Sequence, residues 1–375
     1  MEQTKINTRQ LFILAIMFEL GSSAVIPVGT SAMQDVWLVV LIGLVLGMAL
    51  FLVYYRLSQY YPGDVLTAYT ERIVGVWPGR VLAVIYIVYF LYLTARVLRN
   101  FGELLLMFAY METPLIILNA IMMLTVIYAI YKGIEVVART GELYIIGQAL
   151  ATAAGFALVI MSGIMNLNLL KPVLQAGWGQ IWKTAATETT FIPFGEMIVF
   201  TMLFPLVNRP ERTGRTLLAA MLISGLILAA ITTLNVTVLG AETVARSVFP
   251  LLDTVRRIEV ARFLERFDAF FMIVLIVGGF FKASVYFYAA VEGTVRLFRM
   301  RKQHRLVYPL GLLVLIISLA TASNFAEHLK EGLQISTMYL HIPLQVVVPI
   351  VLLCIAAFRR RKAERKDHSG DKSDS

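Results

Sequence analysis

The sequence predicts an all-α membrane protein with ten transmembrane helices, arranged as a five-plus-five inverted repeat. Three observations predict this fold class. The chain is 59% hydrophobic and 15% charged, whereas soluble proteins contain about 25% charged residues. Ten apolar stretches are long enough to cross the roughly 30 Å of hydrocarbon in a bilayer. The first and sixth stretches are both interrupted near the middle, which is typical of folds built from inverted repeats.

The predicted spans follow one another along most of the chain. Their limits are 9–34, 36–55, 80–107, 113–131, 142–165, 188–207, 216–239, 268–296, 307–323 and 338–358. Residues 1–360 are therefore expected to form a single polytopic membrane domain. The polar residues 361–375 are expected to form a disordered cytoplasmic tail.

Basic residues predict the orientation of the chain and explain its net charge of +9. With the N-terminus inside, the inner segments contain more lysine and arginine than the outer ones, so both termini are expected in the cytoplasm. This distribution is typical of membrane-flanking anchors and argues against nucleic-acid binding. The single cysteine, Cys354, excludes an intramolecular disulfide and makes a cysteine-based metal site implausible.

Two interruptions mark the candidate site. Gly21-Ser22-Ser23 interrupts the first span, and Pro193-Phe194-Gly195 interrupts the sixth. A helix breaks at membrane depth only where its freed backbone groups face protein, water or a ligand, so the pair predicts a buried small-molecule site. A plainer interpretation stays open, in which these residues only allow close packing or a kink.

Four ionisable residues are expected inside the membrane: Glu19, Arg96, Glu196 and Lys282. A charge at the bilayer centre costs at least about 2.5 to 3.5 kcal/mol, so such residues usually face the bundle interior and pair. Two acids and two bases make a neutral set. We interpret them as a polar cluster beside the ligand cavity or along an ion path, or as an ion-pair network that fixes helix packing.

Other residue patterns suggest no chemistry of their own. The aromatic stripe of the third span is interpreted as packing or an interfacial belt; it consists of Tyr86, Tyr89, Phe90 and Tyr92. The four histidines are expected at or beyond the membrane boundaries, and their spacing does not match metal ligands; they are His304, His328, His341 and His368. No phosphate-binding loop, nucleophile elbow or zinc motif occurs, so neither an enzyme nor a cofactor is expected.

Several segments together resemble the endospore germination permease family, the GerAB/GerKB-type subunits of nutrient germinant receptors. The resemblance covers about residues 5–360 and rests on the order and spacing of four motifs. These are Tyr60-Tyr61-Pro62-Gly63 with Leu66-Thr67-Ala68-Tyr69, Tyr131 to Arg139, Phe194 to Phe200 with Leu203-Phe204-Pro205, and Phe281-Lys282-Ala283-Ser284 through Gly293 to Leu297-Phe298.

The resemblance implies the fold of the amino acid-polyamine-organocation transporter superfamily and a location in the spore inner membrane. It also implies two partners, an A-type membrane subunit and a C-type lipoprotein. In that superfamily a small nutrient such as an amino acid contacts the two helix breaks. The matching positions here are Gly21, Ser22, Ser23, Phe194, Gly195 and Glu196.

Two other functions remain open at this point. A proton- or ion-coupled amino acid transporter would have the same breaks, with Glu19 or Glu196 carrying the proton. A conduit for water or ions through the polar cluster is the other. A receptor built on a transporter fold retains the same breaks and charges, so the sequence does not separate these possibilities.

Overall fold

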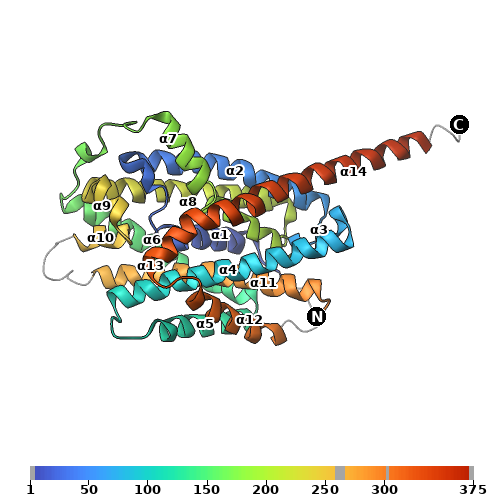
Figure 1. Cartoon of the computed structure of the whole chain (residues 1–375), viewed down its shortest axis with the longest axis horizontal. Coiled ribbons are helices and arrows are strands. Elements are labelled where there is room, and N and C mark those ends of the chain that lie inside the picture. Colours follow the sequence, from blue (N-terminus) through green and yellow to red (C-terminus); the bar gives the residue numbers. More distant parts are fainter. Residues whose placement is uncertain (1–4, 258–266, 301–303, 371–375) are drawn as a thin grey trace.

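The computed structural model describes residues 5–257, 267–300 and 304–370 as an almost entirely helical bundle (Figure 1). The first half contains α1 (Thr8–Ser23), η1 (Thr30–Asp35), α2 (Val36–Tyr60), α3 (Leu66–Val74), α4 (Val76–Phe108), α5 (Leu115–Lys132) and α6 (Ile134–Met161). The middle contains η2 (Leu167–Leu170), α7 (Gly177–Thr184), η3 (Ala185–Thr189), η4 (Phe194–Met202) and η5 (Phe204–Leu206). The remainder contains α8 (Pro210–Leu239), α9 (Ala241–Arg246), α10 (Pro250–Arg256), α11 (Phe267–Leu297), α12 (His304–Ala320), α13 (Phe325–Lys330), η7 (Glu331–Ile335), η8 (Thr337–Val347) and α14 (Val348–Gly370).

Seven helices in the described part of the chain are long and apolar enough to cross a membrane. They include α2, α4, α5, α6, α8, α11 and the continuous stretch from α13 to α14. Predicted spans one and six are the two broken segments, and the ninth corresponds to the 17-residue α12, which is apolar but shorter. The all-helical class with broken helices one and six is confirmed, while the count of ten spans stays a prediction.

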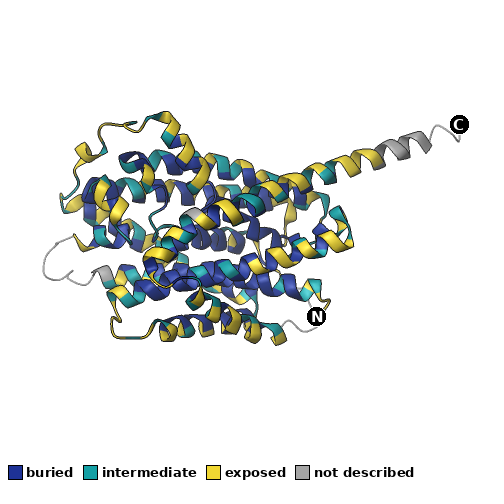
Figure 2. Cartoon of the chain, in the orientation of Figure 1, coloured by how far each residue is buried: buried dark blue, intermediate teal, exposed yellow. Residues whose placement is uncertain are grey.

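Helix α1 lies at the centre of the bundle and is buried along almost its whole length (Figure 2). It packs against α6, α8 and α11. Asn7 and Gln10 form a reciprocal capping box that satisfies backbone amides at its start. At its other end, a Cβ on Gly21 would lie only 2.6 Å from the carbonyl oxygen of Gly278. Gly21 therefore lets the backbones of α1 and α11 touch.

The outer helices present apolar side chains to the surroundings of the bundle. On α6, Leu143 is 79% exposed and Leu150 is 66% exposed. Apolar residues at such positions are expected to face lipid, because the hydrocarbon solvates them as well as a protein core does.

The last long segment is irregular. It begins at α13, continues through the π-helical stretches η7 and η8, and ends in α14, which projects away from the bundle (Figure 1). Pro343 lies inside η8. Helix α14 continues to Gly370. The expected division into a membrane domain over residues 1–360 and a disordered tail over residues 361–375 stays a prediction. Residues 371–375 lie outside the described residues.

Candidate functional site

The first break lies directly after the predicted residues. Gly21, Ser22 and Ser23 form the last turn of α1, and the non-helical stretch covers residues 24–29. It ends at Gly29, whose φ of 78° is a left-handed conformation that favours glycine. The glycine at position 21 signalled close helix packing, and the chain leaves the helix three residues later.

The second break matches the predicted position. The π-helical η3 ends at Thr189, a turn follows over residues 190–193, and the 3₁₀-helical η4 begins at Phe194. The amide of Gly195 donates to the carbonyl of Thr190 at 2.8 Å, so the backbone bridges the interruption. Phe194, Gly195 and Glu196 are all buried in the first turn of η4.

A small cavity of about 30 Å³ lies between the two breaks. Among its lining residues are Ser23, Ala24, Ile26, Pro27 and Val28 from the first break, Thr189, Ile192, Pro193 and Phe194 from the second, and Leu228, Ile231, Thr232 and Asn235 from α8. This volume has room for water molecules only. An amino acid would therefore fit only if the cavity widened.

Glu188 links the two broken segments beside this cavity. Its Oε2 accepts a hydrogen bond from the Gly29 amide at 3.0 Å, and its Oε1 accepts one from the Ser31 hydroxyl at 2.8 Å. The Ser31 hydroxyl also lies 3.2 Å from the Thr184 hydroxyl. Sequence analysis did not identify Glu188, because its partners are about 160 residues away and no local motif marks it.

Three of the four predicted intramembrane charges come together. The Nζ atom of Lys282 on α11 lies 2.5 Å from Oε2 of Glu196 on η4, and both side chains are buried. The ammonium group also lies 5.0 Å from the centre of the Phe18 ring. Glu19 on α1 is completely buried near this pair. Among the described residues its carboxylate has no hydrogen bond of standard geometry, although the Ser224 hydroxyl lies near it.

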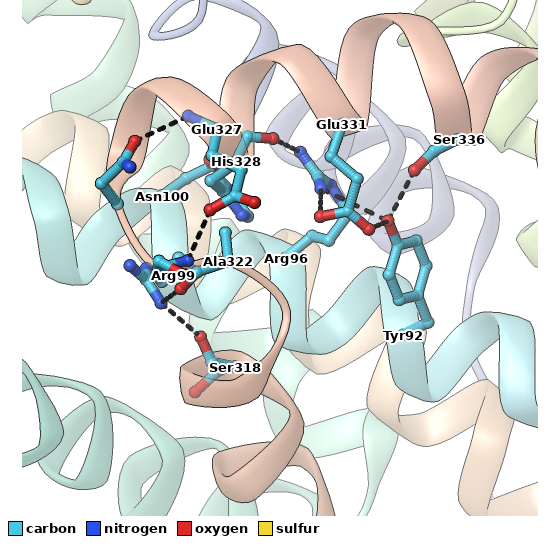
Figure 3. A network of polar contacts seen from close by, with 12 residues as sticks. Tyr92, Arg96, Arg99, Asn100, Ser318, Ala322, Glu327, His328, Glu331 and Ser336 are labelled. Carbon is cyan, nitrogen blue, oxygen red and sulfur yellow. Dashed lines mark hydrogen bonds and ion pairs between the residues drawn. The ribbon is translucent and has the colours of Figure 1, made fainter.

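Arg96, the fourth predicted charge, belongs to a different network (Figure 3). Its guanidinium donates to the carbonyl of His328 at 2.8 Å and lies 3.7 Å from the carboxylate of Glu331. It also donates to the Tyr92 hydroxyl at 3.3 Å. A Cβ on Gly332 would lie 1.7 Å from a guanidinium nitrogen, so the glycine makes room for Arg96. The network joins α4 to the junction of α13 and η7.

The aromatic stripe of α4 does more than pack. Tyr86 donates to the Leu344 carbonyl at 2.8 Å, the Tyr89 hydroxyl lies 2.6 Å from Nδ1 of His341, and the Tyr92 hydroxyl lies 2.5 Å from that of Ser336. All three partners belong to the last long segment. The stripe is therefore a row of hydrogen bonds along one helix face as well as part of the packing.

Two of the histidines expected at or beyond the membrane boundaries are buried inside the bundle. His341 is buried beside Tyr89, and His328 is buried with its Nε2 atom 2.9 Å from the Asn100 side chain. The segment enters the bundle earlier than its hydropathy suggests, which brings both rings inside. No local sequence pattern pairs His341 with Tyr89 or His328 with Asn100, because about 230 to 250 residues separate the partners.

Gln345 connects this row to the second break. Its Nε2 donates to the Tyr89 hydroxyl at 2.8 Å, while its Oε1 has no hydrogen-bond partner among the described residues. A Cβ on Gly195 would lie 2.2 Å from that Oε1 atom. Tyr54 reinforces the contact by donating to the carbonyl of Gln345 at 2.6 Å. Gly195 thus allows the last segment to approach the break closely.

The described residues contain no group of three or more histidine, cysteine or acidic side chains placed to hold a metal ion. The arrangement instead combines a cavity between two broken helices, a buried ion pair and a row of hydrogen bonds to the last segment. The cavity itself is lined by apolar side chains, serine and threonine residues and Asn235, while the ion pair and the row of hydrogen bonds lie outside its lining.

The fold and its two broken helices define a permease-like membrane protein with an amino acid transporter-like fold. The solved structure of MhsT in complex with L-phenylalanine matches it with a TM-score of 0.66 and 13% sequence identity, over 95% of this chain and 99% of that one. The family model described as spore germination protein matches residues 5–326. The chain therefore belongs to the spore germination protein family and is an integral membrane protein.

Curated relatives agree with this assignment. Spore germination protein KB of Bacillus subtilis (strain 168) is 44% identical over 97% of this chain and 98% of its own length. Spore germination protein YndE of the same organism is 27% identical over 96% and 98% of the two chains. Spore germination protein A2, also from that organism, is 24% identical over 79% of each chain. The family resemblance found in the sequence is confirmed.

Proposed function

We propose that this chain is the B-type, permease-like subunit of a spore nutrient germinant receptor, and that it binds a small nutrient such as an amino acid between the two helix breaks. The cavity enclosed by both breaks is the observation that carries the proposal. Membership of the spore germination protein family supports the biological role. The solved structure with L-phenylalanine, a protein of the same fold, supports the class of ligand.

The chemistry of the cavity suits a small zwitterion. Interrupted helices expose backbone amides to an anion and carbonyls to an ammonium group. Ser23 and Phe194 line the cavity directly. The other proposed ligand-site residues, which surround the breaks and shape them, are Gly21, Ser22, Gly195 and Glu196.

Ligand binding would act by shifting a conformational equilibrium. The cavity is too small for an amino acid, so a nutrient would bind a wider state of it. We expect the contacts of Glu188 with Gly29 and Ser31 across the breaks to change in that state. A ligand shifts an equilibrium only through its different affinities for the two states. In this proposal the A-type membrane subunit and the C-type lipoprotein respond to that shift in the spore inner membrane, with both termini of this chain in the cytoplasm.

A pair of valines on α2 provides a matched test. Val40 lines the cavity and is 5% exposed, whereas Val45 is 66% exposed on the same helix. We expect Val40→Ala to enlarge the cavity and to change the nutrient response by about 10- to 200-fold between amino acids that differ by a methylene group. The measurement is germination of spores whose only nutrient receptor contains this chain with its partner subunits, across a panel of single amino acids and sugars.

Val45→Ala is the control and should leave the nutrient preference unchanged at equal protein levels. An unchanged preference in the Val40→Ala spores would place the ligand elsewhere. This pair is more informative than a bulky replacement of Gly195, because any side chain there would collide with Gln345 and disturb packing as well as binding.

One observation favours a second function, proton- or ion-coupled amino acid transport. Glu19 is buried near the Lys282–Glu196 pair and among the described residues lacks a hydrogen bond of standard geometry, which is typical of an acid that carries a proton across a membrane. Counterflow of labelled amino acid in proteoliposomes tests this possibility. A transporter should exchange labelled for unlabelled amino acid, because its one site opens to each side of the membrane in turn. Glu19→Gln should abolish proton-driven uptake. Saturable binding without any exchange would support the sensor.

A further inference from the structure

A second and larger pocket lies away from the helix breaks, at one end of the bundle. It has a volume of about 560 Å³ and lies where α2 ends, η5 ends and α8 begins, beside the C-terminal helix α14. None of the residues assigned to the nutrient site lines it. It is therefore a separate pocket from the cavity between the breaks.

Two arginines from opposite ends of the sequence meet at one aromatic ring in this pocket. The guanidinium carbons of Arg56 and Arg360 lie 5.2 Å and 5.4 Å from the centre of the Tyr60 ring. All three residues line the pocket. A guanidinium that stacks on a ring directs its N–H donors along its own plane, where they can form paired hydrogen bonds with an oxyanion.

The rest of the lining adds neutral donors to these two charges. Gln59 and Tyr61 contribute an amide and a hydroxyl group, whereas the Ser58 hydroxyl already donates to the carbonyl of Tyr55. Thr213 is 2% exposed, and within the described residues its hydroxyl has no hydrogen-bond partner. A buried hydroxyl that lines a pocket and lacks a partner is a group that a polar ligand can satisfy.

The pocket lining also contains two acidic residues, Asp64 and Glu211. Asp64 forms an ion pair with Arg72 at 3.0 Å, so its charge is already compensated. Glu211 is the other acidic lining residue and lies in the first turn of α8. Arg56 and Arg360 therefore supply the guanidinium groups of this lining, and further basic residues follow from Arg359 to Lys362 on α14.

The composition of the neighbouring helices predicts that the pocket lies at the depth of lipid headgroups. The last membrane-length stretch changes from apolar to basic after Phe358, and α2 changes from apolar to polar residues near Arg56. Phe204, Pro205 and Val207 provide an apolar side to the same pocket. An amphipathic molecule with an anionic head and apolar chains would contact both parts.

We propose that this pocket binds the phosphate-bearing headgroup of an anionic phospholipid, with Arg56 and Arg360 as its charged contacts. Basic pockets at the ends of transmembrane helices recognise such headgroups through charge and hydrogen bonds. The same chemistry would accept free phosphate, and the experiment separates the two sources. Occupancy of the pocket would join α14 to α2 and α8 through the ligand.

The test is native mass spectrometry of the purified, delipidated full chain titrated with phosphatidylglycerol or with phosphatidylcholine. We expect one phosphatidylglycerol molecule to bind preferentially, and the variant Arg56→Gln/Arg360→Gln to bind it at least about tenfold more weakly, because two charge-assisted contacts are lost. Inorganic phosphate is the second arm. Displacement of phosphatidylglycerol by inorganic phosphate at comparable concentration would assign the site to free phosphate and overturn the lipid proposal.

Arg361→Gln is the matched control, because Arg361 neighbours Arg360 but does not line the pocket. Equal weakening by the control and by the pocket variant would show general charge attraction and overturn the proposal, as would equal binding of the two lipids. Thermal unfolding without lipid checks that each variant is folded. Tyr60→Leu retains both charges but removes the stacking ring, and it should weaken phosphatidylglycerol binding while Arg361→Gln does not.

Discussion

The buried pair Lys282–Glu196 and the Arg96–Glu331 contact use the same chemistry in different surroundings. Lys282 and Glu196 are 0% and 6% exposed, and they connect α11 to the second break. Arg96 and Glu331 are 11% and 26% exposed and 3.7 Å apart, and Arg96 also donates to a backbone carbonyl. The first pair has no solvent to replace a lost partner, whereas the side chains of the second pair are partly exposed and Arg96 retains a backbone carbonyl. The energetic importance of an intramembrane charge therefore depends on which other groups can stabilise it when its partner is lost.

The comparison predicts its largest effect at Lys282. Lys282→Met would leave Glu196 and Glu19 buried without a cation, and breaking a buried pair typically costs about 3 to 5 kcal/mol. We expect a loss of this size in the free energy of unfolding, measured by denaturant titration in detergent micelles. The double variant Lys282→Met/Glu196→Gln should recover much of the loss, because it removes the unpaired carboxylate. Equal stability of the single and double variants would contradict the pairing.

A smaller effect is expected in the row of hydrogen bonds that lies between the two pairs. Tyr89→Phe removes a hydroxyl that contacts His341 and Gln345, and an unsatisfied buried polar group costs about 1 to 3 kcal/mol. The same unfolding assay measures this loss. Tyr144→Phe is the control, since Tyr144 is 48% exposed, and it should change stability little. Equal effects of both variants would show that the hydroxyl of Tyr89 contributes nothing specific.

The smallest effect is expected at Glu331. Glu331→Gln retains the shape of the side chain and removes a partly solvated ion pair, so the loss should be about 0 to 1 kcal/mol. Added salt should reduce the difference between the variant and the unchanged protein, because it screens the pair. Thermal unfolding at low and high ionic strength measures both quantities. A loss as large as that of Lys282→Met would remove the distinction between the two pairs.

Much of the fold could be predicted because hydrocarbon imposes simple rules on sequence. Apolar segments of sufficient length, the interruptions near Gly21 and Pro193 and the burial of Glu19, Glu196 and Lys282 all follow from the cost of polar groups in a membrane. These rules predict how deep in the membrane a residue lies, but not which neighbouring segment its side chain faces. Arg96 has the same expected depth as Lys282, yet it faces α13 instead of the second break.

The parts that could not be predicted depend on irregular backbone. The π-helical stretches η7 and η8 change which side chains of the last segment face α4, so the contact of Tyr89 with His341 has no helical periodicity to reveal it. Glu188 reaches Gly29 only because two distant interruptions meet. The sequence pattern at Gly21 predicts the region of the first break correctly, but the direct role of this glycine is its close contact with Gly278.

That glycine contact also determines how the centre of the molecule can move. A Cβ on Gly278 would lie 3.0 Å from the Cα of Gly21, so no side chain lies between the two backbones. Separating them would open a void that lipid cannot fill, and close-packed elements shift as rigid bodies rather than deform. We therefore expect helices α1 and α11 to move as one rigid unit, which would carry Glu19 and Lys282 together. A movement of this unit relative to η4 would lengthen the contact between Lys282 and Glu196, so the ion pair would resist that movement.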